Sequence, residues 1–283
     1  MKEKYCDVHV HSIYSDGTYT PEEILLEAER AGLSAVALCD HNTVDGVMHF
    51  RRAAEGKRVE AILGAEFSVG FEGEELHLLG LYLPDAAIPI LNDRMVEVQR
   101  RKDESNIEMI DRLCRAGYKI SYDEIKSGTP GGLCNRAHIA LALTEKGYTP
   151  TINAAFRTVL SPTAGFYRPP ERISIFTMLD LLTELNVVPV LAHPLLTLSP
   201  ERLSALLPQA KKHGLVGMEC YYVSYSPRSM ALSLGLADTN RLCYSGGSDF
   251  HGATKPDVKL GVGRGNLQIP CRWAEALREA QMR

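Results

Sequence analysis

The chain has 283 residues and a formal net charge of −4, and 45% of its residues are hydrophobic and 23% charged. This length and composition are typical of one α/β domain, with or without an insertion. The acidic balance argues against binding of long-duplex nucleic acid, and no apolar run approaches the roughly 18 residues of a membrane span. We therefore expect a cytoplasmic protein that does not bind membranes.

The first predicted strand alternates polar and apolar residues. Asp7, His9 and His11 alternate with two valines, so a regular strand would direct the three polar side chains to one face. Two neighbouring imidazoles at a strand end suit a metal ion better than a hydrophobic core. The turn that follows carries Asp16, which brings a carboxylate within reach of the same place.

Alternating helices and strands follow. Thr20 is a suitable N-cap, and Pro21 a suitable first residue, for a helix that ends at Gly32. The apolar run 33–39 predicts a buried strand that leads into His41. Further strands are predicted at 60–68, 76–83 (paired with 60–68), 187–192, 215–220 and 242–245, and helices at 44–56, 86–117, 173–185, 200–213, 226–237 and 272–281.

Roughly seven strand–helix steps predict a closed or nearly closed α/β barrel. Between residues 100 and 170 the pattern changes to short helices separated by Gly- and Pro-rich turns such as 128–132. We therefore expect a barrel formed by residues 1–99 and 171–283, with residues 100–170 as a small helical insertion.

Six of the nine histidines, together with three carboxylates, stand at predicted strand ends. Functional side chains of an α/β barrel gather at the C-terminal ends of its strands. Imidazoles and carboxylates without thiolates are typical of a hydrolytic site for divalent metal ions. Nine ligands exceed the need of one ion, so we expect two or three. The residues are His9, His11, Asp16, His41, Glu66, His77, His193, Asp249 and His251.

These residues lie in motifs that resemble those of the polymerase and histidinol phosphatase (PHP) family. The motifs occur in the family's order, as His9-x-His11-Ser-x-x-Ser-Asp16-Gly, Asp40-His41-Asn42, Gly64-x-Glu66, His77-Leu-Leu-Gly, Ala192-His193-Pro194 and Gly247-Ser-Asp249-Phe-His251-Gly. The resemblance implies a distorted seven-stranded, TIM-like (β/α)7 barrel. It also implies a metal-dependent phosphatase or phosphodiesterase, a hydrolase of phosphate esters.

The resemblance further implies a ligand set for each ion. One ion would be held by His9, His11, Glu66 and Asp249. A second would be held by Glu66, His77 and His193, with Glu66 as the bridge, and a third by Asp16, His41 and His251. Several family members have histidine where this chain has Asp16, so two ions are better supported than three. The expected metals are Mn²⁺, Zn²⁺ or Fe²⁺, with Mg²⁺ less favoured, and Asp7 is expected to orient a histidine.

The predicted insertion favours the branch of the family that acts on nucleotides. Residues 135–140 are similar to the Arg-Pro-His-Ile-Ala segment of nucleoside 3′,5′-bisphosphate phosphatases and of a 5′-to-3′ exoribonuclease, with Ala137 in place of the proline. Arg136 and His138 would then bind a substrate phosphate. The alternatives are an arginine paired with a nearby acid and a histidine that caps a helix.

We therefore expect a phosphoesterase that acts on small nucleotides or the 5′ ends of short oligonucleotides through a hydroxide that bridges two metal ions. The expected catalytic residues are Glu66, Asp249, His193 and His251, and either histidine is a candidate proton donor to the leaving oxygen.

Three other residues and two other functions remain open. Arg168 is a further phosphate-binding candidate, and Tyr167 and Tyr222 are either base-stacking or core aromatic residues. Histidinol-phosphate phosphatase is the alternative enzyme, and a non-catalytic PHP scaffold module is the alternative of a different class. The sequence leaves the oligomeric state open, a monomer included.

Overall fold

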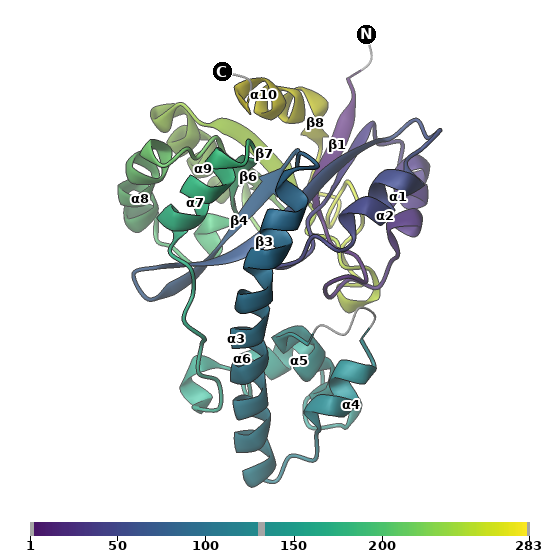
Figure 1. Cartoon of the computed structure of the whole chain (residues 1–283), viewed down its shortest axis with the longest axis vertical. Helices are drawn as coiled ribbons and strands as arrows, with labels where there is room; N and C mark the ends of the chain where they lie inside the picture. Colours follow the sequence, from purple (N-terminus) through teal and green to yellow (C-terminus); the bar gives the residue numbers. More distant parts are fainter. Residues whose placement is uncertain (1–2, 130–133, 282–283) are drawn as a thin grey trace.

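The computed structural model describes residues 3–129 and 134–281. Its strands form one eight-stranded sheet in the order β7-β6-β5-β4-β3-β2-β1-β8, and helices surround this sheet (Figure 1). The strands are β1 (Tyr5–Val10), β2 (Ala35–Leu38), β3 (Glu60–Phe71), β4 (Glu74–Leu81), β5 (Val188–Ala192), β6 (Gly217–Tyr222), β7 (Cys243–Gly247) and β8 (Ile269–Pro270).

The sheet is nearly closed. Just beyond β7, Phe250 pairs with Val10 at the end of β1, and Phe250 O accepts a hydrogen bond of 2.9 Å from His11 N. The predicted α/β barrel is therefore confirmed, with the two-residue β8 as an additional strand beside β1.

One strand runs against its neighbours. β4 pairs antiparallel with both β3 and β5, which confirms the predicted pairing of the 60–68 and 76–83 strands. The chain reverses between β3 and β4 at a tight turn that includes Gly73, whose φ is 83°. The parallel arrangement of the strands is therefore interrupted at β4. Because β4 is reversed, its first residues lie beside the last residues of its neighbours. His77 accordingly pairs with Ser68 and Ala192.

The first helix, α1 (Pro21–Arg30), begins as predicted, because Thr20 Oγ1 accepts a hydrogen bond from Glu23 N and the Glu23 carboxylate accepts one from Thr20 N. Among the described residues, no helix is both long and apolar enough to cross a membrane. The other helices of the barrel are α2 (Val47–Ala53), α7 (Ile175–Glu184), α8 (Pro200–Lys212), α9 (Pro227–Asn240) and α10 (Cys271–Gln281).

An apolar cluster fills the barrel interior. It combines side chains from strands on both sides of the sheet order, among them Val8, Ala37, Ile62 and Val190, with Leu277 of α10. Helix α10 packs at the end of the barrel where β1 begins, since its first residue follows β8 and donates a hydrogen bond to Lys4 O. The opposite end, where most strands finish, is therefore left for polar residues.

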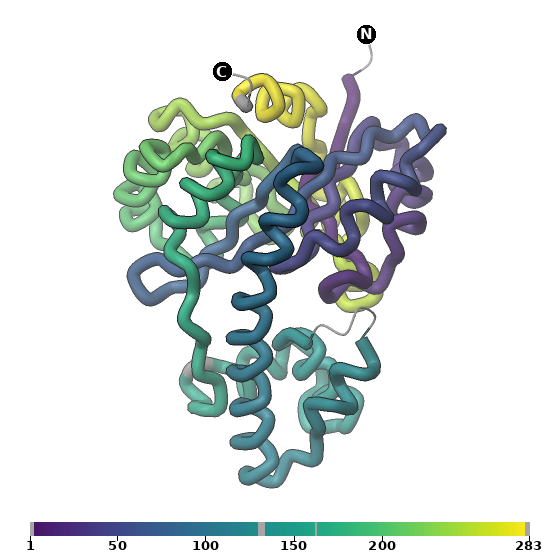
Figure 2. The backbone as a smooth tube through the Cα atoms, viewed as in Figure 1, coloured from purple at the N-terminus to yellow at the C-terminus, as the bar shows by residue number. Residues whose placement is uncertain are grey.

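A helical lobe extends from the barrel. The 29-residue helix α3 (Ala87–Arg115) begins among the core residues of the barrel, where Leu91 and Met95 are buried. It ends in a separate apolar cluster that includes Met109 and Leu113. The lobe also contains α4 (Tyr122–Ser127), α5 (Arg136–Glu145) and α6 (Ile152–Arg157), and the chain returns to the barrel through the segment before α7 (Figure 2). Part of the predicted turn at 128–132 lies outside the described residues.

Candidate metal centre

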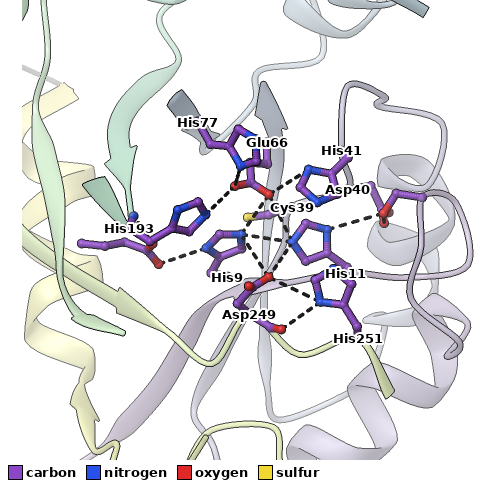
Figure 3. A network of polar contacts seen from close by, with 12 residues as sticks. His9, His11, Cys39, Asp40, His41, Glu66, His77, His193, Asp249 and His251 are labelled. Atoms are coloured by element: carbon purple, nitrogen blue, oxygen red, sulfur yellow. Dashed lines mark hydrogen bonds and ion pairs between the residues drawn. The ribbon is translucent and has the colours of Figure 1, made fainter. Parts of the chain in front are cut away.

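The structure brings the nine predicted ligand residues together at the open end of the barrel, and Figure 3 labels all of them except Asp16. Within each of four overlapping groups, the ligand atoms all lie within 4.8 Å of one another. The groups are His9, Glu66 and His193; His9, His11 and Asp249; His41, Glu66 and His77; and His11, Asp16, His41 and His251. Which ion each residue would hold stays a prediction.

Glu66 lies at the middle of the cluster and has an exposed fraction of 0%. Its Oε1 is 2.7 Å from His77 Nδ1 and 3.0 Å from His193 Nε2. Its Oε2 is 3.0 Å from His41 Nδ1 and 3.1 Å from His9 Nε2. The two oxygens of this one carboxylate thus face different histidines, which is the arrangement that a bridge between two ions requires.

His11 connects this part of the cluster to Asp16. Its Nε2 is 3.2 Å from Asp249 Oδ1, and its Nδ1 is 4.0 Å from Asp16 Oδ1. Asp16 Oδ1 is also 3.3 Å from His251 Nε2 and 3.9 Å from His41 Nε2. Asp16 therefore faces three imidazoles, one more than the predicted third ligand set contains.

The donor atoms of the cluster fit divalent ions. Asp16 Oδ1 and Glu66 Oε2 are buried and accept no hydrogen bond from the described residues. His9 Nε2 and His11 Nε2 are 3.1 Å apart, a contact that needs a proton or a metal ion between or beside the two nitrogens. The atoms are imidazole nitrogens and carboxylate oxygens, which suit zinc, manganese and iron.

The pKa values of His11 and His77 are raised by the carboxylates beside them, whereas those of His41 and His251 are lowered by burial. Burial alone lowers the pKa of His11, but Asp249 and Glu66 outweigh burial and raise it to about 9. Burial likewise opposes protonation of His77, whereas Glu66 and Glu75 raise its pKa to about 10. Positive charge next to Glu66, Glu75 and Asp249 is therefore favourable, and divalent ions can supply it in place of protons.

Residues outside the predicted set orient the ligands. Glu219, buried on β6, has its Oε1 3.0 Å from His9 Nδ1, and its Oε2 accepts a 2.8 Å hydrogen bond from His193 N. Tyr222 Oη donates to Asp249 Oδ2 at 2.7 Å, which leaves Asp249 Oδ1 facing the cluster. Sequence reasoning missed Glu219, although a carboxylate inside an apolar strand is the same signal that identified Glu66.

Asp7 contacts His9 through its backbone and not its ring, since His9 N donates a hydrogen bond of 3.4 Å to Asp7 Oδ1. The register of β1 shifts between Asp7 and Val10, so the expected alternation is interrupted. The Asp7 carboxylate also accepts hydrogen bonds from Ser248 N at 2.9 Å and Gly261 N at 2.7 Å. It thus holds the loop that carries Asp249 against β1.

The backbone is strained at two candidate ligands. His193 has a φ of 28° and Asp249 a φ of 53°, although neither is glycine. Such conformations are costly and persist where the surrounding structure enforces them, often at functional sites. Here the hydrogen bond from His193 N to Glu219 and the contact of Asp249 N with His9 O, at 2.9 Å, hold the two residues in place.

A cavity extends from the cluster into the helical lobe. It borders Asp16, His41 and His77, and its far wall includes Lys102, Arg136 and Arg172. The Arg136 guanidinium lies 4.3 Å from the centre of the Tyr167 ring, and its Nη2 is 3.4 Å from Glu75 Oε2. Among the described residues, Lys102 has neither a hydrogen bond nor an ion pair. Sequence reasoning missed Lys102 and Arg172.

Arg136 and His138, both predicted to bind substrate phosphate, line two hollows that each border Asp16. His138 accepts a hydrogen bond from Asn135 N at Nδ1 and so caps α5, which was the alternative role considered for it. It lines the second of these hollows, and Arg136 lines the first. Burial lowers the pKa of His138, which disfavours the protonated form of this imidazole.

Arg168 differs from expectation, whereas Tyr222 has the core role that the sequence left open for it and Tyr167 lines the cavity. The side chain of Arg168 is exposed and does not line the cavity, where Arg172 stands instead. Tyr222 is only 5% exposed and is bonded to Asp249, so it offers no face to a base. The ring of Tyr167 stacks against Arg136.

Removal of divalent ions is expected to lower thermal stability. An ion at 100 times its dissociation constant adds about 2.7 kcal/mol to the native state, which corresponds to roughly 4 °C in Tm for a chain of this size. Melting of chelator-treated protein with and without added Mn²⁺ measures the effect. Protons compete for the same nitrogens, so the shift should shrink as the pH is lowered. An identical Tm in all samples would contradict a metal centre.

Comparison with known proteins adds independent findings. The model of the PHP domain matches residues 7–186. A 5′-3′ exoribonuclease of Haemophilus influenzae is 28% identical, covering 97% of this chain and 93% of that protein. A phosphoribosyl 1,2-cyclic phosphate 1,2-diphosphodiesterase of Eggerthella lenta is 31% identical, covering 87% and 94%. A 3′,5′-nucleoside bisphosphate phosphatase of Chromobacterium violaceum is 27% identical, covering 87% and 86%.

A solved structure shares the whole fold. A protein of Bifidobacterium adolescentis, described as a metal-dependent phosphoesterase, superposes with a TM-score of 0.85 and is 26% identical. The match covers 98% of this chain and 96% of that one, so the barrel and the helical lobe are both included.

Proposed function

This chain belongs to the PHP domain family, and from that premise we propose that it hydrolyses phosphate esters of small nucleotides or of the ends of short oligonucleotides. The observation that carries the proposal is Glu66, a buried carboxylate whose two oxygens face two sets of histidines beside a cavity with a cationic wall. The relatives act on nucleic acid ends, a bisphosphorylated nucleoside or a cyclic sugar phosphate, as their names state.

We propose that two or three ions, of Mn²⁺, Zn²⁺ or Fe²⁺, bind in the sets implied by the family motifs. Bound ions of this kind neutralise phosphate oxygens and lower the pKa of water toward neutrality. Glu66 would join the first two sites. Support for the third comes from Asp16, whose buried Oδ1 faces His251, His41 and His11 without a hydrogen bond from any described residue.

The remaining side chains would position the substrate and move its proton. His251 Nδ1 is 2.8 Å from Asp249 O. Donation to this carbonyl leaves Nε2 unprotonated, which suits a metal ligand. His193 Nε2 likewise faces Glu66 Oε1, at 3.0 Å, as a metal ligand would, so neither histidine is preferred as the proton donor to the leaving oxygen. Arg136, Arg172 and Lys102 line the cavity beside the cluster and would bind a further anionic group of the substrate.

The two parts of the chain would have separate roles. We propose that residues 1–99 and 171–283 carry the metal centre and that residues 100–170 supply the wall that binds the rest of the substrate. Helix α3 crosses the boundary between the two parts and contributes buried residues to each apolar cluster.

Phosphate release by Mn²⁺- and Zn²⁺-loaded protein tests the proposal. The panel comprises a nucleoside 3′,5′-bisphosphate, a mononucleotide, phosphoribosyl 1,2-cyclic phosphate, a short 5′-phosphorylated RNA and histidinol phosphate. Hydrolysis of a nucleotide or RNA end is the expected result. Hydrolysis of histidinol phosphate alone would favour the alternative enzyme, and no release from any compound would favour a non-catalytic scaffold.

Arg136→Ala is expected to raise KM for a nucleoside 3′,5′-bisphosphate by about 10- to 100-fold, because a charge-assisted hydrogen bond contributes roughly 1.5–3 kcal/mol. A phosphate ester without a second anionic group should be affected much less. Steady-state kinetics with both substrates measure the difference. Arg168→Ala is the matched control, since Arg168 lies outside the cavity, and equal effects of the two variants would contradict the role of Arg136.

A further inference from the structure

Glu75 lies between the candidate metal centre and the cationic wall of the cavity. It is two residues before His77 on β4, so the two side chains share a face of the strand. Glu75 Oε1 is at ion-pair distance, 3.7 Å, from His77 Nε2. The other ring nitrogen, His77 Nδ1, is 2.7 Å from Glu66 Oε1. A single imidazole therefore separates Glu75 from the central carboxylate of the cluster.

The other oxygen of Glu75 holds two arginines. Arg172 Nη2 donates a 2.7 Å hydrogen bond to Glu75 Oε2, and Arg136 Nη2 lies 3.4 Å from the same atom. Arg172 and Arg136 would repel each other without a carboxylate between them. Glu75, Arg136 and Arg172 together carry a net charge of +1, which suits a second anion.

The position of Arg172 is set by the return of the chain to the barrel. Gly70 of β3 pairs with Ser174, and Gly70 N donates a 2.8 Å hydrogen bond to Ile173 O. A Cβ atom at Gly70 would lie 3.3 Å from Arg172 Cβ, so the glycine permits this close approach. The Arg172 side chain is only 13% exposed. Arg172 is thus a mostly buried part of the cavity wall.

We infer that Glu75 is a positioning residue that joins the metal centre to a second-anion site formed by Arg136 and Arg172. The inference rests on the proposed function, because the anion would be a second phosphate of a nucleotide substrate. Glu75 directs His77 Nδ1 toward the cluster, in the way that carboxylates orient metal-binding histidines. It also holds the two guanidinium groups at the cavity, so substrates with a second anionic group are preferred.

Glu75→Gln in the full chain tests both roles of Glu75, the orientation of His77 and the placement of the two arginines. The variant keeps the size of the side chain and loses its charge. We expect Mn²⁺ binding to metal-free protein, measured by calorimetry, to weaken by about 10-fold. KM for a nucleoside 3′,5′-bisphosphate should rise by about 10-fold, and KM for a mononucleotide should rise less. Glu75→Asp, which keeps the charge, should restore part of the Mn²⁺ affinity.

Glu74→Gln is the matched control. Glu74 is the neighbouring residue, and it pairs with Arg202, which does not line the cavity, at 3.2 Å. We expect this variant to bind Mn²⁺ and substrate as the unmodified chain does. Unchanged Mn²⁺ affinity in a folded Glu75→Gln protein would overturn the inference, and so would an unchanged preference for the bisphosphate. If the unmodified chain hydrolyses no ester, the proposed function fails, and the Mn²⁺ titrations alone still decide the role of Glu75.

Discussion

Glu66→Gln is expected to reduce phosphate ester hydrolysis by at least about 1,000-fold, which corresponds to about 4 kcal/mol of transition-state stabilisation. Glutamine has nearly the same shape, but it is neutral and offers one oxygen. Because Glu66 Oε1 faces His77 and His193 while Oε2 faces His41 and His9, the amide cannot serve both sets. The variant should also bind at least one fewer metal ion.

Kinetics and metal analysis of the same Glu66→Gln preparation measure these losses. Glu60→Gln is the control, because Glu60 is the exposed first residue of the same strand and pairs with Arg278. It should retain both activity and metal content. Near-normal turnover by Glu66→Gln with unchanged metal content would refute the bridging role.

Gly247→Ala is expected to disrupt the centre without altering any ligand. A Cβ atom at Gly247 would lie 2.2 Å from His9 Cβ and 2.9 Å from His9 N, so the backbone of β1 or β7 must shift. Overpacking of this kind costs about 1–3 kcal/mol of stability, and the displacement of a ligand by about 1 Å can reduce activity by about 100-fold. We expect both losses, together with weaker Mn²⁺ binding.

Gly235→Ala provides the comparison for Gly247→Ala. An added Cβ at Gly235 meets no atom within 4 Å, and the residue lies in α9. This substitution should be neutral or stabilise the protein by up to about 1 kcal/mol. Denaturant unfolding and metal titration of both variants measure the contrast. Unfolding and metal binding by Gly247→Ala that match the unmodified chain would show that β1 and β7 can separate freely at this point.

The sequence allowed the barrel and the position of the cluster to be predicted because both depend on local patterns. Apolar runs that end in histidine or carboxylate mark most of the strand ends that a barrel brings together, although β3 continues beyond Glu66 to Phe71 and His77 lies within β4. The helix start at Thr20 was equally local, since its capping partner Glu23 is three residues away.

The features that sequence reasoning missed depend on distant pairing. Periodicity reveals neither the direction of β4 nor the shifted register of β1 against β2. It also does not reveal that the Asp7 carboxylate bonds to Ser248 and Gly261, far along the chain. Arg172 rather than Arg168 lines the cavity because Ser174 pairs with Gly70 about a hundred residues earlier. No local signal distinguishes the two arginines.

The length of helix α3 sets the distance between the helical lobe and the barrel. One end is anchored in the barrel by Leu91 and Met95, and the other in the lobe by Met109 and Leu113. An α-helix advances about 1.5 Å and turns about 100° per residue, so one inserted residue would swing the lobe aside, whereas seven would carry it about 10 Å away with nearly the same face inward. Lengthening or shortening this one helix by whole pairs of turns would therefore change the substrate length that fits, with every metal ligand kept.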